Sequence, residues 1–407
     1  MYVRTHSVKV NVYVRIGDIV AGADSYVVTL TDKRYRMSAL FSEGQLGALK
    51  LANRIAVSPM CQYMAKEGAA NSWHTVHLGS LALSGAAVLF IEATAVEAVG
   101  RITPADLGLW DDATEAALRG TLSAVRDVSA TPLVLQLAHA GRKGSSKVPW
   151  EGGQLIPASS AQGWVTEAPS AIAQRDGEAQ PAAMDPAAML RVRDAFVAAA
   201  RRAARLGIDA LELHAAHGYL LHQFLSPLSN RRTDSYGGKL QNRLRYPLEV
   251  LDAVREAFPS GKPIGIKISA TDWMENGWDL EQSLALADAL KARGIDWISV
   301  SSGGISPLQK IQPAPGYQVP FAAAIRKATR VKTIAVGLID DAQQAETIIA
   351  AGQSDFVALA RGMLYDPRWP WHAAAQLGAT IAAPPPYWRA PPQIHAGLFQ
   401  DARFGAR

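Results

Sequence analysis

Two histidines and a tyrosine lie close together in the stretch LELHAAHGYLLHQFL, at His214, His217 and Tyr219. A pair of imidazoles can hold a metal ion, satisfy backbone groups in a core, or donate hydrogen bonds to one substrate oxygen on which negative charge develops. Apart from Glu212, no third metal ligand stands beside them, which argues against a metal site. We therefore predict an oxygen clamp, with Tyr219 as a nearby proton donor.

A lysine, Lys267, stands in the middle of the apolar run PIGIKIS. Burying a free ammonium group is costly, so we expect an anionic or electron-rich neighbour for it. Burial also lowers the pKa of a lysine, which would suit a Schiff-base enzyme. Two alternatives stay open at this point, a Schiff-base lysine and a site for a cofactor that carries negative charge.

Glycines and one arginine follow the last three apolar runs of the chain. Gly303 and Gly304 follow WISVSS, Gly337 follows KTIAV, and Arg361 and Gly362 follow FVALA. Glycine lets backbone amides approach an anion closely, and arginine adds a charged fork. Tight turns would explain any one of these glycines alone, but the set together with an arginine predicts a phosphate site.

The elements that must position these residues form a repeated pattern of short apolar runs, each followed by an amphipathic, often alanine-rich segment. Near-continuous hydrophobicity is typical of parallel strands that helices cover on the outside. Eight units without a glycine-rich dinucleotide turn after the first strand favour a closed (β/α)8 TIM barrel over a doubly wound sheet. The runs are RIAVSPM, AVLFIEATAV, PLVLQLAHAG, ALELHAAHG, PIGIKIS, WISVSSGG, KTIAVGLI and FVALARGM.

The chain divides into an N-terminal extension, residues 1–36, and a single barrel with a C-terminal tail, residues 37–407. The extension could form a hairpin or precede a native start at Met37. One connection inside the barrel, residues 142–186 after the third strand, is abnormally long. Loops of this length in compact domains are usually lids or binding elements.

The composition argues against nucleic acid and membrane partners. The formal charge is +5, and residues 1–36 supply six basic against three acidic side chains, so the barrel is close to neutral. The single cysteine allows neither an intramolecular disulfide nor a cysteine cage for a metal. With no export signal and no apolar run long enough for a membrane span, we expect a cytoplasmic protein.

Several of these segments resemble the old yellow enzyme flavoproteins, in particular their thermophilic-like ene-reductase branch. The similarity runs from about Met37 to Arg389. Its most specific segments are HAAHGYLLHQFLSPLSNRRTDSYGGKLQNR from His214, SPMCQY from Ser58, IEATAV from Ile91, QLAHAGRK from Gln136 and ALARGML from Ala358.

The resemblance implies bound FMN, NADPH or NADH as the hydride donor, and ping-pong transfer to an activated alkene such as an enone, enal, maleimide or nitroalkene. It implies that His214 and His217 hold the carbonyl or nitro oxygen, and that Tyr219 protonates the α-carbon while hydride reaches the β-carbon. The implied FMN contacts are Pro59, Met60, Cys61, Ala93, Gln136, Lys267, Ser302, Gly303, Gly304, Gly337, Arg361 and Gly362.

The same resemblance places Cys61 and Tyr63 near both flavin and substrate. Trp369 is a candidate wall of the substrate space, with helix packing as the alternative. Arg389 would enter the active site of a partner subunit in a homodimer or homotetramer. Family members usually have arginine where Lys267 stands, so the lysine could shift the potential of the flavin.

Four other enzyme classes compete with this prediction. Dienoyl-CoA reductases and amine dehydrogenases carry an iron-sulfur motif and further domains, which one cysteine and an end at residue 407 do not accommodate. A Schiff-base aldolase that uses Lys267, or a metal-dependent hydrolase that uses the histidines, stays as the alternative on the same barrel.

Overall fold

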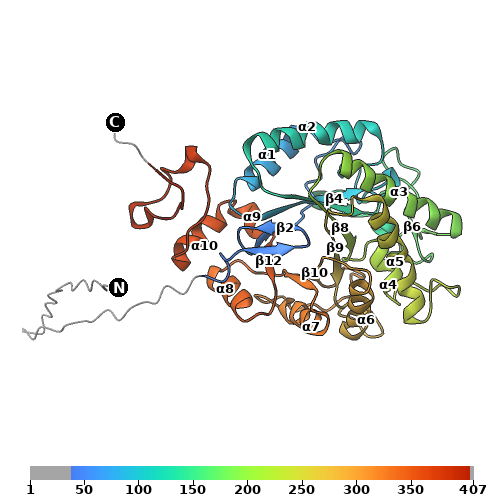
Figure 1. Cartoon of the computed structure of the whole chain (residues 1–407). Coiled ribbons are helices and arrows are strands. Elements are labelled where there is room, and N and C mark those ends of the chain that lie inside the picture. Colours follow the sequence, from blue (N-terminus) through green and yellow to red (C-terminus); the bar gives the residue numbers. More distant parts are fainter. Residues whose placement is uncertain (1–37, 404–407) are drawn as a thin grey trace, which may run out of the picture. The chain divides into compact units, whose positions relative to one another are not determined.

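The computed structural model describes residues 38–403, so the predicted N-terminal extension lies outside the described residues. Eight parallel strands close into a barrel in the order β3, β4, β5, β8, β9, β10, β11, β12 (Figure 1). They coincide with the eight predicted runs, so the predicted (β/α)8 TIM barrel is confirmed. The strands are β3 (Ile55–Val57), β4 (Val88–Ala95), β5 (Leu133–Ala138), β8 (Ala210–Ala215), β9 (Ile264–Ser269), β10 (Trp297–Ser301), β11 (Lys332–Ala335) and β12 (Phe356–Leu359).

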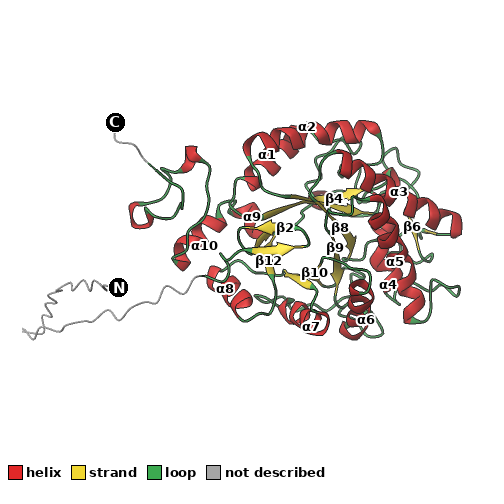
Figure 2. Cartoon of the chain, viewed as in Figure 1, coloured by secondary structure: helices red, strands yellow, loops and turns green. Residues whose placement is uncertain are grey.

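Helices surround the barrel and alternate with its strands (Figure 2). Five of them begin at an Asn or Asp whose side chain accepts a hydrogen bond from an amide of the first turn, which satisfies a donor that the helix itself leaves unpaired. The helices are α1 (Ser72–Ala82), α2 (Asp112–Val128), α3 (Pro186–Arg205), α4 (Leu220–Leu225), α5 (Leu240–Ala257), α6 (Leu280–Lys291), α7 (Val319–Thr329), α8 (Ala342–Ala350), α9 (Arg361–Tyr365) and α10 (Trp369–Leu377).

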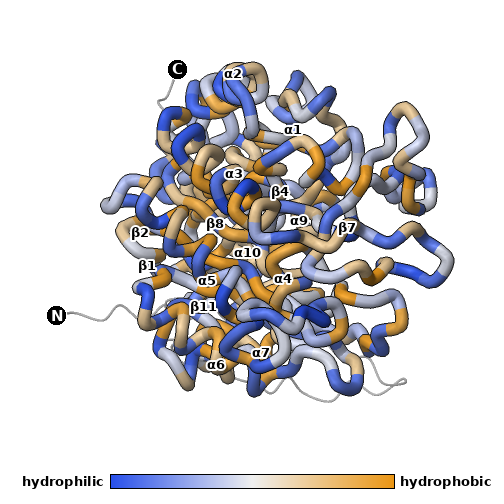
Figure 3. The backbone as a smooth tube through the Cα atoms, turned by 90° about the vertical axis from the view of Figure 1, so that its right-hand side faces the viewer, coloured by the Kyte–Doolittle hydropathy of each residue, from blue (hydrophilic) through white to orange (hydrophobic). Residues whose placement is uncertain are grey.

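The barrel has two hydrophobic layers, and Figure 3 shows apolar segments concentrated towards the interior. One layer lies between the strands and the helices. The other fills the barrel itself and includes Phe90, Trp297 and Phe356. A hairpin of β1 (Gly44–Leu46) and β2 (Leu49–Leu51) adds Leu46 and Leu51 to this inner layer. Its turn lies against Pro263, directly before β9, so the hairpin closes the amino end of the barrel. The sequence patterns did not predict it.

The predicted long insertion after β5 is present and mostly irregular. It contains the 3-10 turns η2 (Gly141–Lys143) and η3 (Pro149–Glu151) and two paired short strands, β6 (Glu167–Ala168) and β7 (Ala182–Ala183). Arg142 fastens it to the barrel, because its buried guanidinium donates to the carbonyl of Ile305 at 2.7 Å and to that of Ile172 at 3.3 Å. The insertion therefore borders the carboxyl ends of the strands.

The C-terminal tail continues from α10 through the short turns η4 (Pro385–Tyr387) and η5 (Gln393–His395). A small hydrophobic cluster holds it, in which Ile381, Leu398 and Phe399 pack against Trp371 of α10. The remaining 3-10 turn of the described chain is η1 (Ala98–Gly100). Among the helices of residues 38–403, none combines the length and the apolar character that crossing a bilayer requires.

Candidate active site

The predicted clamp residues lie together at the carboxyl end of β8. His214 is in the strand, and His217 and Tyr219 are in the turn that leads to α4. The ring centre of His214 is 5.2 Å from that of His217 and 4.9 Å from that of Tyr219, and the planes are nearly perpendicular. His217 adopts a left-handed backbone conformation with φ of 57°, which costs a non-glycine residue energy and is held by a bond from its amide to Ser269 Oγ at 2.9 Å.

Both imidazoles are neutral. Burial lowers the pKa of His214 and His217 well below the ordinary value, and the charges of Lys267 and Lys143 lower it further. His214 Nδ1 accepts a bond from the amide of Ala216 at 3.2 Å, so the single ring hydrogen of His214 is on Nε2. The clamp can therefore donate hydrogen bonds but carries no charge of its own.

The hydrogen of His217 follows from its contact with Ser301. His217 Nε2 is 2.7 Å from Ser301 Oγ. That hydroxyl is also 3.2 Å from Gln318 Oε1, which already accepts from Ser302 at 2.6 Å. We assign the Ser301 hydrogen to the shorter contact, which leaves His217 Nδ1 as the donor. Among the described residues, Nδ1 of His217 has no hydrogen-bond partner.

Tyr219 keeps its proton, because burial raises the pKa of its phenol well above 10.0, and the Cys61 and Tyr63 groups add to this shift. The ammonium of Lys143 lies 5.0 Å from the centre of the Tyr219 ring. It donates to the carbonyl of His217 at 2.8 Å and to that of Gly304 at 3.2 Å, and burial lowers the pKa of this lysine to about 8. Lys143 thus ties the turns after β8 and β10 together beneath the proton donor.

The segment after β3 brings Pro59, Met60, Cys61 and Tyr63 to the same rim, where all four are partly buried. Burial raises the pKa of the Cys61 thiol well above 9.0, which keeps it protonated and argues against a nucleophile. Burial likewise raises the pKa of Tyr63. The Trp150 ring from the insertion meets that of Tyr63 edge to face at 5.9 Å, although Trp150 is exposed. No sequence signal identified this tryptophan.

The middle of the barrel presents polar side chains below the histidines. Lys267 is paired in register with His214 across β8 and β9, and its Nζ has one hydrogen-bond partner in the described chain, Ser58 Oγ at 3.3 Å. Burial lowers the pKa of Lys267, and the charge of Glu212 opposes that shift. Gln136, from β5, is in register with Glu212 and donates to its carboxylate at 2.7 Å. Among residues 38–403, Lys267 has no ion-pair contact, since its hydrogen-bond partner is a serine.

A β-bulge in β4 determines which residues of IEATAV face the site. The register with β5 shifts between Ile91 and Thr94. Ala93 consequently lines a small cavity together with Tyr219, whereas Glu92 accepts a bond from the amide of Gln62 at 2.9 Å. Bulges near active sites often re-aim one side chain in this way. Burial raises the pKa of Glu92 to about 8.

The predicted phosphate residues lie at the ends of β10, β11 and β12. Gly304 and Gly337 both have positive φ, at 95° and 113°. A Cβ atom on Gly304 would be 2.4 Å from the backbone of His217, and one on Gly337 would be 2.6 Å from Gln318 Nε2. Only glycine fits both turns. Ser302 is buried, while Arg361 at the start of α9 is exposed and Gly362 follows it.

Two predicted residues do not join the histidine pair. Trp369 is buried in the layer between strands and helices, and its Nε1 donates to the carbonyl of Asp340 at 2.6 Å, so this placement agrees with helix packing rather than with a substrate wall. Arg389 is exposed in the tail after η4 and has no polar contact with the described residues. Within one chain, it is therefore not part of the assembled site.

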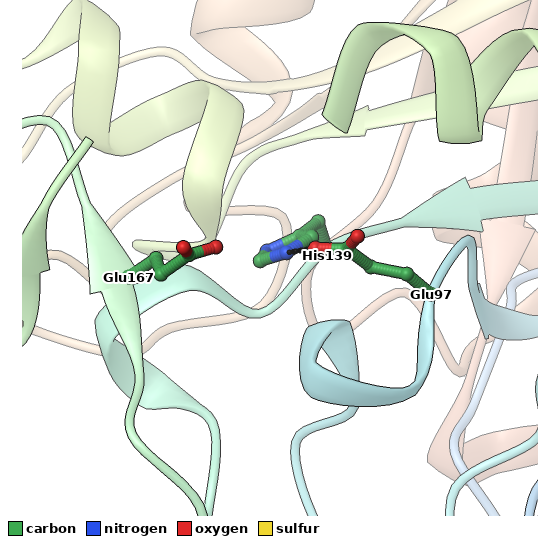
Figure 4. Close-up of side chains that lie close together, drawn as sticks. All are labelled: Glu97, His139 and Glu167. Atoms are coloured by element: carbon green, nitrogen blue, oxygen red, sulfur yellow. Dashed lines mark hydrogen bonds and ion pairs between the residues drawn. The ribbon is translucent and has the colours of Figure 1, made fainter. Parts of the chain in front are cut away.

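A separate polar cluster lies where the insertion meets η1. Glu97, His139 and Glu167 offer ligand atoms within 4.8 Å of one another, and Figure 4 shows the imidazole between the two carboxylates. Arg191 pairs with both carboxylates, and His139 Nε2 is 3.0 Å from Glu97 Oε1. Burial raises the pKa of Glu97, but the bonds from His139 and Arg191 prevail and lower it to about 2. Because these charges are already compensated, we describe the cluster as a structural ion-pair network.

The comparisons with known proteins decide the family. Residues 39–379 match the model of the NADH:flavin oxidoreductase / NADH oxidase family. The chain belongs to this family. Its resemblance to old yellow enzymes is thereby confirmed, and it is an FMN-dependent NAD(P)H oxidoreductase.

Curated family members are similar over nearly their whole length. An NADPH dehydrogenase of Geobacillus sp. (strain WCH70) is 42% identical over 352 residues, which cover 86% of this chain and 98% of the relative. One of Listeria innocua serovar 6a is 42% identical over 358 residues, covering 87% and 99%. Among solved structures, morphinone reductase in complex with tetrahydroNAD has 28% identity and a TM-score of 0.70, covering 85% of this chain and 93% of that one.

The residues of the site fit FMN. Lys267 is a buried cation without a carboxylate in ion-pair contact, which suits an electron-rich ring edge. Gly304 and Gly337, in the turns after β10 and β11, have the positive φ that is common in backbone turns that bind anions, and exposed Arg361 has no acidic partner in the described chain. In contrast, the one group of possible metal ligands in residues 38–403 contains neither His214 nor His217.

Besides Trp150, the sequence patterns missed the roles of three residues that shape this site, Glu212, Lys143 and Glu92. Glu212 was considered only as a metal ligand, and neither Lys143 nor Glu92 was assigned a role. A buried acidic residue inside an apolar strand is a detectable signal of a paired polar group. The partner of each, however, is a residue of another strand or loop, and the sequence does not say which.

Proposed function

We propose that this protein is an ene-reductase, which reduces the carbon-carbon double bond of enones, enals, maleimides or nitroalkenes. The observation that carries the proposal is the pair of neutral imidazoles beside a phenol that keeps its proton, with the ring hydrogen of His214 on Nε2 and Nδ1 of His217 without a partner in the described chain. This arrangement suits a carbonyl or nitro oxygen that gains negative charge during the reaction.

In this proposal FMN lies over the carboxyl end of the barrel, with its phosphate at the turns after β10, β11 and β12. Bound FMN supplies a hydride that it takes from NADPH or NADH and passes to the β-carbon of the alkene. The proposed contacts of the ring and the phosphate are Pro59, Met60, Cys61, Ala93, Gln136, Lys267, Ser302, Gly303, Gly304, Gly337, Arg361 and Gly362.

The chain's own residues then perform three tasks. His214 and His217 orient the alkene by donating to its activating oxygen, which polarises the double bond. Tyr219 delivers its phenolic proton to the α-carbon. Cys61 and Tyr63 line the space beside them. Because one pocket serves nucleotide and alkene in turn, ping-pong kinetics follow.

We further propose that the protein is a homodimer or homotetramer, in which Arg389 of one subunit reaches the site of another. The support is that Arg389 is exposed and makes no polar contact with the described residues of its own chain. The near-neutral barrel speaks for small-molecule substrates rather than nucleic acid or membrane partners. The family assignment favours neither the aldolase nor the hydrolase alternative.

The test separates the two half-reactions. Anaerobic titration with NADPH or NADH should bleach the flavin, and cyclohexenone should restore its colour. His214→Ala and His217→Ala should each slow the cyclohexenone step by about 10²- to 10³-fold, as loss of an oxyanion donor does, and spare flavin reduction much more. Stopped-flow absorbance measures both steps.

The matched control is His372→Ala, because the His372 side chain of α10 is exposed and its one polar contact among residues 38–403 is with Asp366. It should leave both half-reactions unchanged. If the two clamp variants reoxidise with cyclohexenone as fast as this control, the oxygen-clamp assignment fails. If cyclohexenone does not reoxidise the reduced wild-type protein, ene-reduction of enones is not its activity.

A further inference from the structure

A carboxylate lies at the centre of the barrel, below the place proposed for FMN. Glu212 of β8 is fully buried and accepts three hydrogen bonds. Gln136 Nε2 donates to Oε1 at 2.7 Å, while Trp297 Nε1 at 3.2 Å and Ser299 Oγ at 2.5 Å donate to Oε2. Glu212 is therefore held inside the barrel by donors from β5 and β10.

This carboxylate determines the orientation of one amide. Both oxygens of Glu212 accept from neighbouring donors, so Gln136 turns its NH2 group towards Glu212; the flipped amide would place oxygen against oxygen. The amide oxygen of Gln136 is then available on the other side. In the described chain this oxygen has no hydrogen-bond partner, which leaves an acceptor at the site proposed for the cofactor.

The same carboxylate faces the buried cation of the site. Lys267 lies on the neighbouring strand, two residue pairs further along the ladder, because Glu212 is in register with Gly265 and His214 with Lys267. The attraction between Lys267 and Glu212 opposes the penalty of burying the ammonium. Two opposite charges and one oriented amide thus lie on three neighbouring strands of the barrel, β9, β8 and β5.

We propose that Glu212 is a positioning residue that sets the reduction potential of bound FMN: it holds the Gln136 amide with its oxygen towards the cofactor, and it offsets the charge of Lys267. The inference rests on the FMN placement proposed above. A purely structural role, in which Glu212 only satisfies Trp297 and Ser299, is the competing explanation. The two explanations differ in whether the reduction potential and the affinity of FMN depend on Glu212.

The experiment compares the midpoint potential and the FMN dissociation constant of holoprotein variants. Glu212→Gln keeps the shape but removes the charge, so the potential should rise, because less negative charge opposes electron uptake. Its amide no longer dictates the orientation of Gln136, so FMN should bind about 3- to 10-fold more weakly, as the loss of one hydrogen bond predicts. Dye-coupled reduction and fluorescence titration provide the two values.

Two comparisons test whether the effect of Glu212 comes from its carboxylate and acts through Gln136. Ser299→Ala is the matched control, because it removes one donor while the carboxylate and its bond to Gln136 stay; its potential should equal that of the wild type. In a double-mutant cycle, Gln136→Leu should weaken FMN binding less in the Glu212→Gln background than in the wild type, since both changes remove the same interaction. If Glu212→Gln does not fold, Glu212→Gln/Lys267→Met is compared with Lys267→Met, and the potential should again rise.

Each failure has a distinct meaning. If Glu212→Gln lowers the thermal midpoint but leaves the potential and the FMN affinity at wild-type values, Glu212 is structural and the inference is overturned. An additive cycle would overturn the part that runs through Gln136. If Gln136→Leu alone changes neither value in the wild-type background, the proposed placement of FMN beside Gln136 is wrong, whatever Glu212 does.

Discussion

Ser301 determines which ring nitrogen of His217 can donate into the site. Its hydroxyl is 2.7 Å from His217 Nε2, and Ser302 occupies the nearby oxygen of Gln318 at 2.6 Å. With the hydrogen of Ser301 assigned to this contact, a side chain outside the stretch HAAHGY sets the tautomer of His217. Because both histidines are neutral, their function depends on the position of a hydrogen and not on charge.

We predict that Ser301→Ala weakens the binding of phenolic ligands by about 3- to 10-fold, since one hydrogen bond that orients His217 is lost. The alkene step should slow in parallel, with flavin reduction less affected. Spectral titration with a phenol measures the affinity. Ser301→Thr retains the hydroxyl and should therefore have the wild-type affinity for the phenol. Equal losses in both variants would show that the hydroxyl is not what matters.

Glu92 makes the stability of the protein depend on pH. Burial raises the pKa of this carboxyl from 4.5 to about 8, with the charge of Asp106 adding to the shift and the Gln62 amide opposing it. Between these two values the folded protein binds a proton that the unfolded chain releases. The contribution of Glu92 to the free energy of unfolding therefore falls as pH rises through this window.

We predict that Glu92→Gln flattens the decline of the free energy of unfolding between about pH 5 and about pH 8, because the amide does not titrate. Urea unfolding at several pH values measures the slope. Glu97→Gln is the control. The pKa of Glu97 is lowered to about 2, so its stabilisation is complete above 4.5 and is lost only as pH falls towards 2. That variant should shift the curve without changing its slope in this window, and a wild-type slope in Glu92→Gln would contradict the prediction.

At the scale of elements, β9 and β10 fit together only because β9 contains a glycine. Gly265 is paired in register with Trp297, whose indole fills the inner layer of the barrel. A Cβ atom on Gly265 would lie 1.9 Å from the Trp297 ring. Neither residue can move far, since Trp297 Nε1 also donates to Glu212.

Gly265→Ala should therefore destabilise the protein by about 1–3 kcal/mol or more, as overpacking of a tight core does. Gly79→Ala is the matched comparison. Gly79 lies inside α1, and no atom is within 4 Å of its added Cβ, so this change should stabilise by about 0.5–1 kcal/mol through helix propensity. Urea unfolding measures both. Equal stability of Gly265→Ala and the wild type would mean that the inner layer relaxes freely.

At the scale of the whole molecule, the tail has a core of its own. Phe399 packs against Trp371 with ring centres 5.0 Å apart, and Ile381 lies in the same cluster. These residues are separate from the two layers of the barrel. Local opening of the tail can therefore occur without unfolding of the barrel.

We predict that Phe399→Ala accelerates tryptic cleavage after Arg389 while the barrel keeps its FMN, because a lost aromatic costs about 3–5 kcal/mol within this small cluster only. Mass spectrometry identifies the cut, and absorbance reports the flavin. Phe224→Ala is the control. Phe224 is fully buried beside Tyr246 in the barrel layer, so that change should lower the global unfolding midpoint instead. Loss of FMN from Phe399→Ala would contradict an independent tail.

Patterns local to the sequence determined the barrel and much of its site. Each strand, covered on both sides, is a continuous apolar run, and polar residues at the end of a run mark the catalytic face. His214, His217 and Tyr219 therefore came together as predicted. The hairpin β1–β2 was missed because strands of three residues carry no periodicity. Trp369 shows a similar limit, since the residue type alone does not say whether a tryptophan lines the substrate space or packs between helices.

Only the tertiary structure decided how distant polar groups pair. Gln136 meets Glu212 across 76 residues, and His217 meets Ser301 across 84. A hydrogen bond depends on distance and angle within a few tenths of an ångström, and the sequence contains no such geometry. The sequence by itself predicted the barrel, and its resemblance to a flavoprotein family indicated the flavin. The folded arrangement decided which imidazole nitrogen, which amide oxygen and which buried charge face it.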